Sequence, residues 1–167
     1  MNDIYRLTLA FREAIDDALD AGEFTDDIGF QDFPNGCCGF TSELLAKYLY
    51  ESGIDTWYIH GEYKFGENAR PHTWLESRDG LVIDITRDQF KKNQGPLHNE
   101  EKVYVGPRDC FCKMFKIDYK VPGFDANTYK DSLVESDVEK KLNNRFGIII
   151  KYIGDNKKKK NKIDSMV

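Results

Sequence analysis

The chain has 167 residues, of which 40% are hydrophobic and 13% aromatic, enough for one domain with a real core. Charged residues make up 32% and the net charge is −5, a balance that argues against a basic surface and a specific nucleic-acid partner. The longest apolar run, residues 147–153, is too short to span a bilayer.

The N-terminal segment lacks the pattern of a secretory signal. Asp3 stands near its start and no long apolar region follows. We therefore expect a cytoplasmic protein, while delivery to another cell by a route other than the Sec pathway stays open. In a reducing compartment the four cysteines are expected as free thiols.

The first predicted element is a helix. Apolar residues recur at helical spacing from Ile4 to Leu19, and Gly22 follows as a stop signal. This spacing predicts an amphipathic helix. Residues 23–36 contain glycine, proline, asparagine and several aspartates, so we expect a loop there.

A second helix should begin near Cys38 and end at Gly53. Its predicted buried stripe consists of Leu44, Leu45, Tyr48 and Leu49. Adjacent cysteines between glycines at such a helix start raise the question of whether one of the thiols has a chemical role.

Three segments rich in β-formers come next: residues 56–63, 72–77 and 80–86. The last two flank the turn signal "RDG", so we expect them to pair as an antiparallel hairpin.

The rest of the chain gives weaker signals. Residues 87–102 are polar and expected to be irregular. Residues 102–106 and 113–120 predict strands, Leu133 to Leu142 a late helix, and residues 147–153 a final strand. Helix first and strands afterwards predict an α+β fold. We expect a single domain over residues 1–153 and a lysine-rich, flexible tail over residues 154–167.

The position of Cys38 suits a nucleophile. A cysteine in the first helical turn lies among unpaired backbone N–H groups and at the positive end of the helix dipole, and both favour the thiolate. The flanking glycines, among them Gly39, let the backbone approach a substrate closely, and nearby N–H groups can receive an oxyanion.

A histidine and an aspartate complete the pattern. With the turn at residues 78–80, His72 and Asp84 fall on diagonal positions of the hairpin. Diagonal residues lie about 7–8 Å apart at the backbone, so a carboxylate can reach an imidazole nitrogen. An imidazole oriented by an acid and aimed at a thiol is the arrangement of cysteine nucleophiles.

The segments "FPNGCCGFTSELLAKYL" and "HTWLESRDGLVIDITRDQF" resemble the papain-like cysteine peptidase superfamily, and within it small bacterial members of the transglutaminase-like branch. That branch has a cysteine starting a helix, a histidine in an "HAW"-like strand and an aspartate on the next strand. The resemblance covers residues 33–90. It implies a papain-like core in which the cysteine helix packs on an antiparallel sheet.

The resemblance assigns the nucleophile to Cys38, the base to His72 and the orienting acid to Asp84. The implied activity is thiol-dependent acyl transfer, with a peptidase or amidase acting on a peptide or protein amide as the leading hypothesis. A glutamine deamidase or a transglutaminase-type transferase shares the first half-reaction and stays open. No cofactor is implied.

Four further residues are secondary candidates near the oxyanion or substrate. Cys37 is the neighbouring thiol and Gly39 follows the nucleophile. Trp74 is a core residue that can also shield the ion pair from water. Gln31 lies a few residues before the cysteine, where papain-like peptidases keep an oxyanion glutamine.

Two other classes of protein are alternatives. One is a catalytically silent binding module with the same fold. The other is a metal or redox module, because Cys110 and Cys112 with the Cys37–Cys38 pair make four thiols. Their spacings lack the usual gap between zinc ligands, so no metal site is expected. The sequence does not indicate the oligomeric state.

Overall fold

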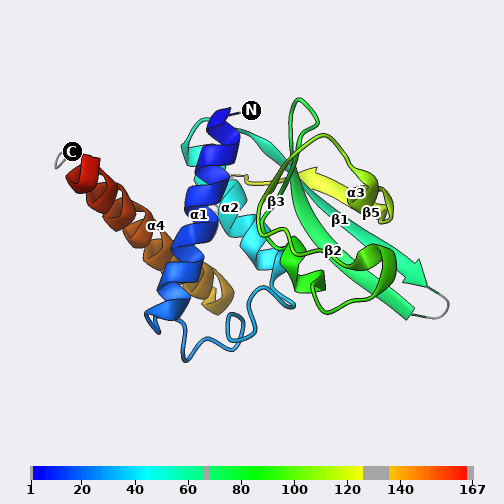
Figure 1. Cartoon of the computed structure of the whole chain (residues 1–167), viewed down its shortest axis with the longest axis horizontal. Coiled ribbons are helices and arrows are strands. Elements are labelled where there is room, and N and C mark those ends of the chain that lie inside the picture. The colour runs from blue at the N-terminus through cyan, green and yellow to red at the C-terminus, as the bar shows by residue number, and fades with distance from the viewer. Residues whose placement is uncertain (1, 66–67, 126–135, 165–167) are drawn as a thin grey trace.

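The computed structural model describes residues 2–65, 68–125 and 136–164. These residues form an α+β fold built on a five-stranded antiparallel sheet with the strand order β4-β3-β2-β1-β5 (Figure 1). The strands are β1 (Thr56–Phe65), β2 (Asn68–Ser77), β3 (Val82–Asp84), β4 (Tyr104–Gly106) and β5 (Lys116–Pro122). The helices are α1 (Asn2–Asp20), α2 (Cys38–Glu51), α3 (Cys110–Lys113) and α4 (Asp137–Asp164), with 3₁₀ turns η1 (Arg87–Phe90) and η2 (Gly95–Leu97).

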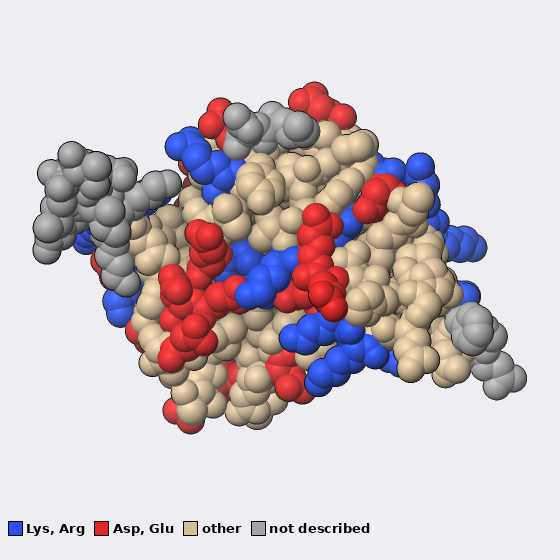
Figure 2. All heavy atoms as spheres, in the orientation of Figure 1, with Lys and Arg blue, Asp and Glu red and all other residues tan. Residues whose placement is uncertain are grey.

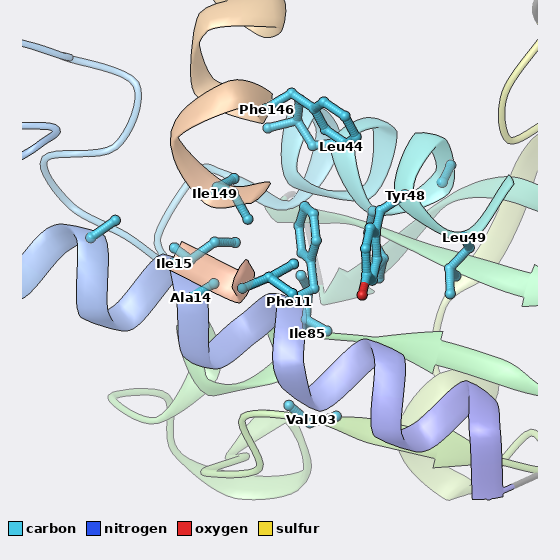
Figure 3. Packing of buried hydrophobic residues seen from close by; sticks show 14 of the residues in the cluster. Phe11, Ala14, Ile15, Leu44, Tyr48, Leu49, Ile85, Val103, Phe146 and Ile149 are labelled. Carbon is cyan, nitrogen blue, oxygen red and sulfur yellow. The ribbon is translucent and has the colours of Figure 1, made fainter. Parts of the chain in front are cut away.

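The three long helices gather on one side of the sheet (Figure 1). Their apolar stripes meet in a core that includes Phe11 and Ile15 of α1, Leu44 of α2, and Phe146 and Ile149 of α4 (Figure 3). Each such side chain contributes about 1.5–3 kcal/mol on burial. The predicted helices over residues 4–19 and 38–53 are confirmed, and the predicted stripe of α2 is buried.

The opposite face of the sheet carries a second, mostly aromatic cluster. Trp74 packs there with Phe90, Phe111 and Phe115. Side chains alternate between the faces of a strand, so Leu75 of β2 enters the helical core while its neighbour Trp74 enters the aromatic cluster. His72 shares the face of Trp74 and is therefore surrounded by rings.

The hairpin of β2 and β3 has the predicted position. Glu76 pairs with Val82, and the turn closes with a hydrogen bond from the Ser77 N–H to the Leu81 carbonyl at 2.8 Å. Gly80 has a φ of +79°, a value that glycine adopts without strain. This register brings Asp84 diagonally opposite His72.

The predicted final strand over residues 147–153 is wrong, because this segment lies inside α4. Phe146, Ile149 and Ile153 are buried at helical spacing. A short apolar run fits a strand and a buried helix equally well by periodicity, and packing against α1 decides for the helix. The helix continues to Asp164, so residues 154–164 of the segment expected to be a flexible tail are helical.

Smaller differences concern the connections. Two 3₁₀ turns interrupt the segment expected to be irregular. Of residues 113–120, expected as a strand, Lys113 ends α3 and β5 begins only at Lys116. The strand β2 begins earlier than expected and forms a long hairpin with β1. Leu133 and Val134, expected in the late helix, lie outside the described residues.

Surface charge and helix apolarity are relevant to nucleic-acid and membrane partners. On the face shown in Figure 2, basic side chains alternate with acidic ones across the middle of the molecule. Within residues 2–65, 68–125 and 136–164, no helix has the length and apolarity that a bilayer span requires.

Candidate active site

The start of α2 presents Cys38. Cys37 is the N-cap residue and its side chain makes no capping hydrogen bond, while its carbonyl accepts from the Thr41 N–H at 3.0 Å. The Ser42 hydroxyl donates to the Thr73 carbonyl at 3.4 Å, which ties this end of the helix to β2. Cys38 is half-buried at the positive end of a helix of 14 residues, next to the strand that carries His72.

The two adjacent thiols have different surroundings. Cys37 is buried, and its Sγ lies within hydrogen-bond distance of the carbonyl oxygens of Gly29 at 2.9 Å and Asn35 at 3.2 Å. Burial, together with the neighbouring Cys38, raises the pKa of the Cys37 thiol to about 12. A protonated, hydrogen-bonded thiol is a poor nucleophile, so of this pair Cys38 has the surroundings of a reactive thiol.

The predicted contact between His72 and Asp84 is present. Both side chains are almost completely buried, and His72 Nε2 lies 2.7 Å from Asp84 Oδ2. Burial by itself would raise the pKa of Asp84, but the charges of His72 and Arg87 outweigh it and lower that pKa. Asp84 is therefore a carboxylate that accepts a hydrogen bond from His72.

Further contacts fix the Asp84 carboxylate. The Thr86 N–H donates to Oδ1 at 3.0 Å, and Arg87 Nε donates to Oδ2 at 3.3 Å. The fully buried Arg87 also bonds Asp109 at 2.7 Å and lies over the ring of Tyr104, 3.6 Å from its centroid. Sequence reasoning gave no role to Arg87, because its partners Asp109 and Tyr104 come from distant segments.

The thiol of Cys38 and the imidazole of His72 influence each other. Burial raises the pKa of Cys38, but hydrogen bonding with His72, the imidazolium charge and the Thr73 backbone together lower it below its ordinary value. Burial opposes protonation of His72, yet Asp84 and Cys38 raise its pKa to about 9. Both shifts favour a thiolate–imidazolium pair.

Aromatic rings enclose the imidazole. The ring centroids closest to His72 are those of Phe90 at 5.2 Å, Phe115 at 5.4 Å, Trp74 at 5.8 Å and Phe111 at 6.0 Å. This wall excludes water from the imidazole, and charges interact more strongly where water is excluded. Trp74 is one of the rings that cover the imidazole.

A further side chain reaches His72 from η1. Gln89 Nε2 lies 2.9 Å from His72 Nδ1, on the other side of the ring from Asp84. The sequence gave no chemical role to Gln89. Gln89 lies in a segment expected to be irregular, and the sequence did not predict the 3₁₀ turn that directs its side chain inward.

Tyr58 of β1 is a third residue to which the sequence gave no role. A Cβ at Gly39 would lie 3.2 Å from the Tyr58 hydroxyl, so the glycine keeps the helix start close to this hydroxyl. Burial raises the pKa of Tyr58 to about 12. Tyr58 is therefore a neutral hydroxyl beside the residue that follows Cys38.

The remaining candidates lie elsewhere. Gln31 is exposed, and its amide donates to the Thr25 carbonyl at 3.3 Å. Cys110 is exposed and Cys112 buried on α3. Among the described residues, no three His, Cys, Asp or Glu side chains gather as a metal site would require.

Comparison of the chain with models of known protein families, with curated protein sequences and with solved structures gives no match. The case for a function therefore depends on the geometry of the site. A half-buried thiol, a buried imidazole and a fixed carboxylate in this order can perform nucleophilic acyl chemistry.

Proposed function

We propose that the protein is a thiol-dependent acyl-transfer enzyme, a cysteine peptidase or amidase acting on a peptide or protein amide. The proposal places it in the papain-like superfamily and its transglutaminase-like branch. The observation that supports it most is the imidazole of His72, which bonds Asp84 at 2.7 Å and lowers the pKa of Cys38.

The proposed reaction has two halves. The Cys38 thiolate attacks the amide carbon, and the carbonyl oxygen becomes an oxyanion, for which backbone N–H groups at the start of α2 are the proposed donors. The His72 imidazolium protonates the nitrogen, and the amine leaves behind a thioester on Cys38. Water then attacks the thioester while His72 takes its proton, which releases the acid and the thiol.

Labelling with a peptide-derived acyl electrophile tests the thiol. The modified residue is mapped by peptide mass spectrometry in the wild type, in Cys38→Ala and in the control Cys110→Ala, which removes an exposed thiol. We expect the label on Cys38 and no labelling of Cys38→Ala beyond background. Equal labelling of all four cysteines would support a silent binding module instead.

Mass analysis of a peptide mixture distinguishes the possible reactions. Cleaved peptides identify a peptidase, conversion of glutamine to glutamate identifies a deamidase, and addition of a supplied amine identifies a transferase. We expect cleavage or amide hydrolysis, because no dedicated site for a second substrate was recognised in the sequence. Products that form equally with Cys38→Ala would contradict the proposal.

A further inference from the structure

The amide of Gln89 has a fixed orientation. Its Nε2 lies 2.9 Å from His72 Nδ1 and 3.0 Å from the carbonyl oxygen of Thr86. A carbonyl oxygen only accepts hydrogen bonds, so the amide nitrogen faces Thr86. Turning the amide over would place two acceptor oxygens against each other. The second N–H of Gln89 is therefore directed at His72 Nδ1.

The other imidazole nitrogen faces an acceptor. Asp84 Oδ2, 2.7 Å from His72 Nε2, belongs to a carboxylate, so Nε2 carries a hydrogen and donates it. In the neutral ring Nδ1 then has a free lone pair, which accepts the N–H of Gln89. Asp84 and Gln89 thus hold the same tautomer of His72 from opposite sides.

Transfer of the Cys38 proton to His72 changes these hydrogen bonds. Because Asp84 engages Nε2, Nδ1 is the nitrogen left to receive the proton of the thiol. Once protonated, Nδ1 becomes a donor, so its N–H and the N–H of Gln89 face each other and cannot form a hydrogen bond. The hydrogen bond from Gln89 is therefore present with the neutral thiol and imidazole and lost in the thiolate–imidazolium pair.

We propose that Gln89 is a positioning residue that holds His72 Nδ1 as an acceptor and shifts the Cys38–His72 pair toward its neutral form. Asp84 acts in the opposite direction. The consequence for catalysis rests on the proposed function, whereas the proton equilibrium exists without turnover. The energy of one neutral hydrogen bond corresponds to a shift of about 2- to 10-fold in this equilibrium.

Among the described residues, the other groups packed around the imidazole do not titrate near neutral pH. From β1, Gly61 is the register partner of His72 and has no side chain. Arg87 bonds the same oxygen of Asp84 as His72 does, and so acts on the ring through that carboxylate. The surrounding rings are those of Trp74, Phe90, Phe111 and Phe115. The position of the proton between Cys38 and His72 is thus set by Asp84, with Arg87 behind it, and by Gln89.

The pH dependence of Cys38 alkylation tests this role. The full chain is treated with iodoacetamide over a pH series, and the modified Cys38 peptide is quantified by mass spectrometry. Gln89→Met removes both N–H groups at similar volume, and the exposed Gln94→Met is the matched control. We expect the alkylation midpoint to fall by about 0.3–1 pH unit in Gln89→Met, and to stay unchanged in Gln94→Met.

Two outcomes are distinguishable. In the first outcome, the alkylation midpoint of the wild type is lower than that of an ordinary thiol, but folded Gln89→Met has the same or a higher midpoint than the wild type. This result would overturn the role of Gln89 and leave the proposed function intact. A wild-type midpoint no lower than that of an ordinary exposed thiol would overturn the proposed function. If Gln89→Met does not fold, Gln89→Asn carries the same test, because its amide is one methylene too short to reach Nδ1.

Discussion

Two thiols of this chain lie beside a cationic partner, at the start of α2 and on α3, and their surroundings have opposite effects. Cys38 adjoins His72, and its pKa is lowered. Cys112 accepts a hydrogen bond from Arg87 Nη2 at 2.9 Å, yet burial and the nearby carboxylates of Asp84 and Asp109 raise its pKa to about 12.

The difference shows that a neighbouring cation does not activate a thiol by itself. The charge of Arg87 is already matched by Asp84 and Asp109, so little of it is left to stabilise a Cys112 thiolate. Cys38 starts a helix of 14 residues, whereas α3 has four. Two regions with similar residue types therefore differ in chemistry because of burial, charge balance and helix length.

The largest expected difference between the two regions is in turnover. Cys38→Ala should abolish activity on any substrate found, while Cys112→Ala should retain it. Cys38 is half-buried at a helix start, so its replacement should change the melting temperature little. Activity assays and thermal melts of both variants check this. Full activity of Cys38→Ala would contradict the assigned nucleophile, and its unfolding would mark Cys38 as a structural thiol.

Arg87→Met should have the largest effect on stability. The substitution leaves the buried Asp84 carboxylate without its guanidinium partner and removes the bond to Asp109, and breaking a buried ion pair costs about 3–5 kcal/mol. Urea unfolding measures the loss, with the exposed Lys91→Met as the control. A stability equal to that of the control would show that the Arg87 network is not structural.

Asp84→Asn should reduce activity by less than removal of Cys38. An asparagine keeps the shape but favours the wrong imidazole tautomer, which in a serine protease costs about 10⁴ in rate. A thiolate already stabilised by the helix start depends less on the acid, so we expect a loss of about 10- to 10³-fold in kcat/KM. Steady-state kinetics check this expectation, and an unchanged kcat/KM would show that Asp84 has no role in catalysis.

The smallest expected effects are on pH profiles. Alkylation of Cys38 should persist below the ordinary thiol pKa and fall only at its lowered pKa, whereas Cys112 should react only in strong alkali. Turnover should also decline above about pH 9, because His72 then loses the proton that the leaving amine requires. Alkylation should show no such alkaline decline. Identical profiles for Cys38 and Cys112 would show that the surroundings of the two thiols do not have opposite effects.

The sequence determined the local parts of this protein. Helical spacing predicted α1 and α2, and the "RDG" turn set the register that makes His72 and Asp84 diagonal neighbours. These features depend on residues close in the chain, since spacing and turn chemistry act locally. Cys38 at a helix start was predicted for the same reason.

The tertiary structure decided what depends on distant segments. The run at residues 147–153 became helix through packing against α1, and a 3₁₀ turn in a segment expected to be irregular brought Gln89 to His72. Arg87 acquired a partner 22 residues away, Asp109 at the start of α3. Burial and charge pairing between such segments set the pKa values of the thiols, and neither can be deduced from residue order, because both arise only when the chain has folded.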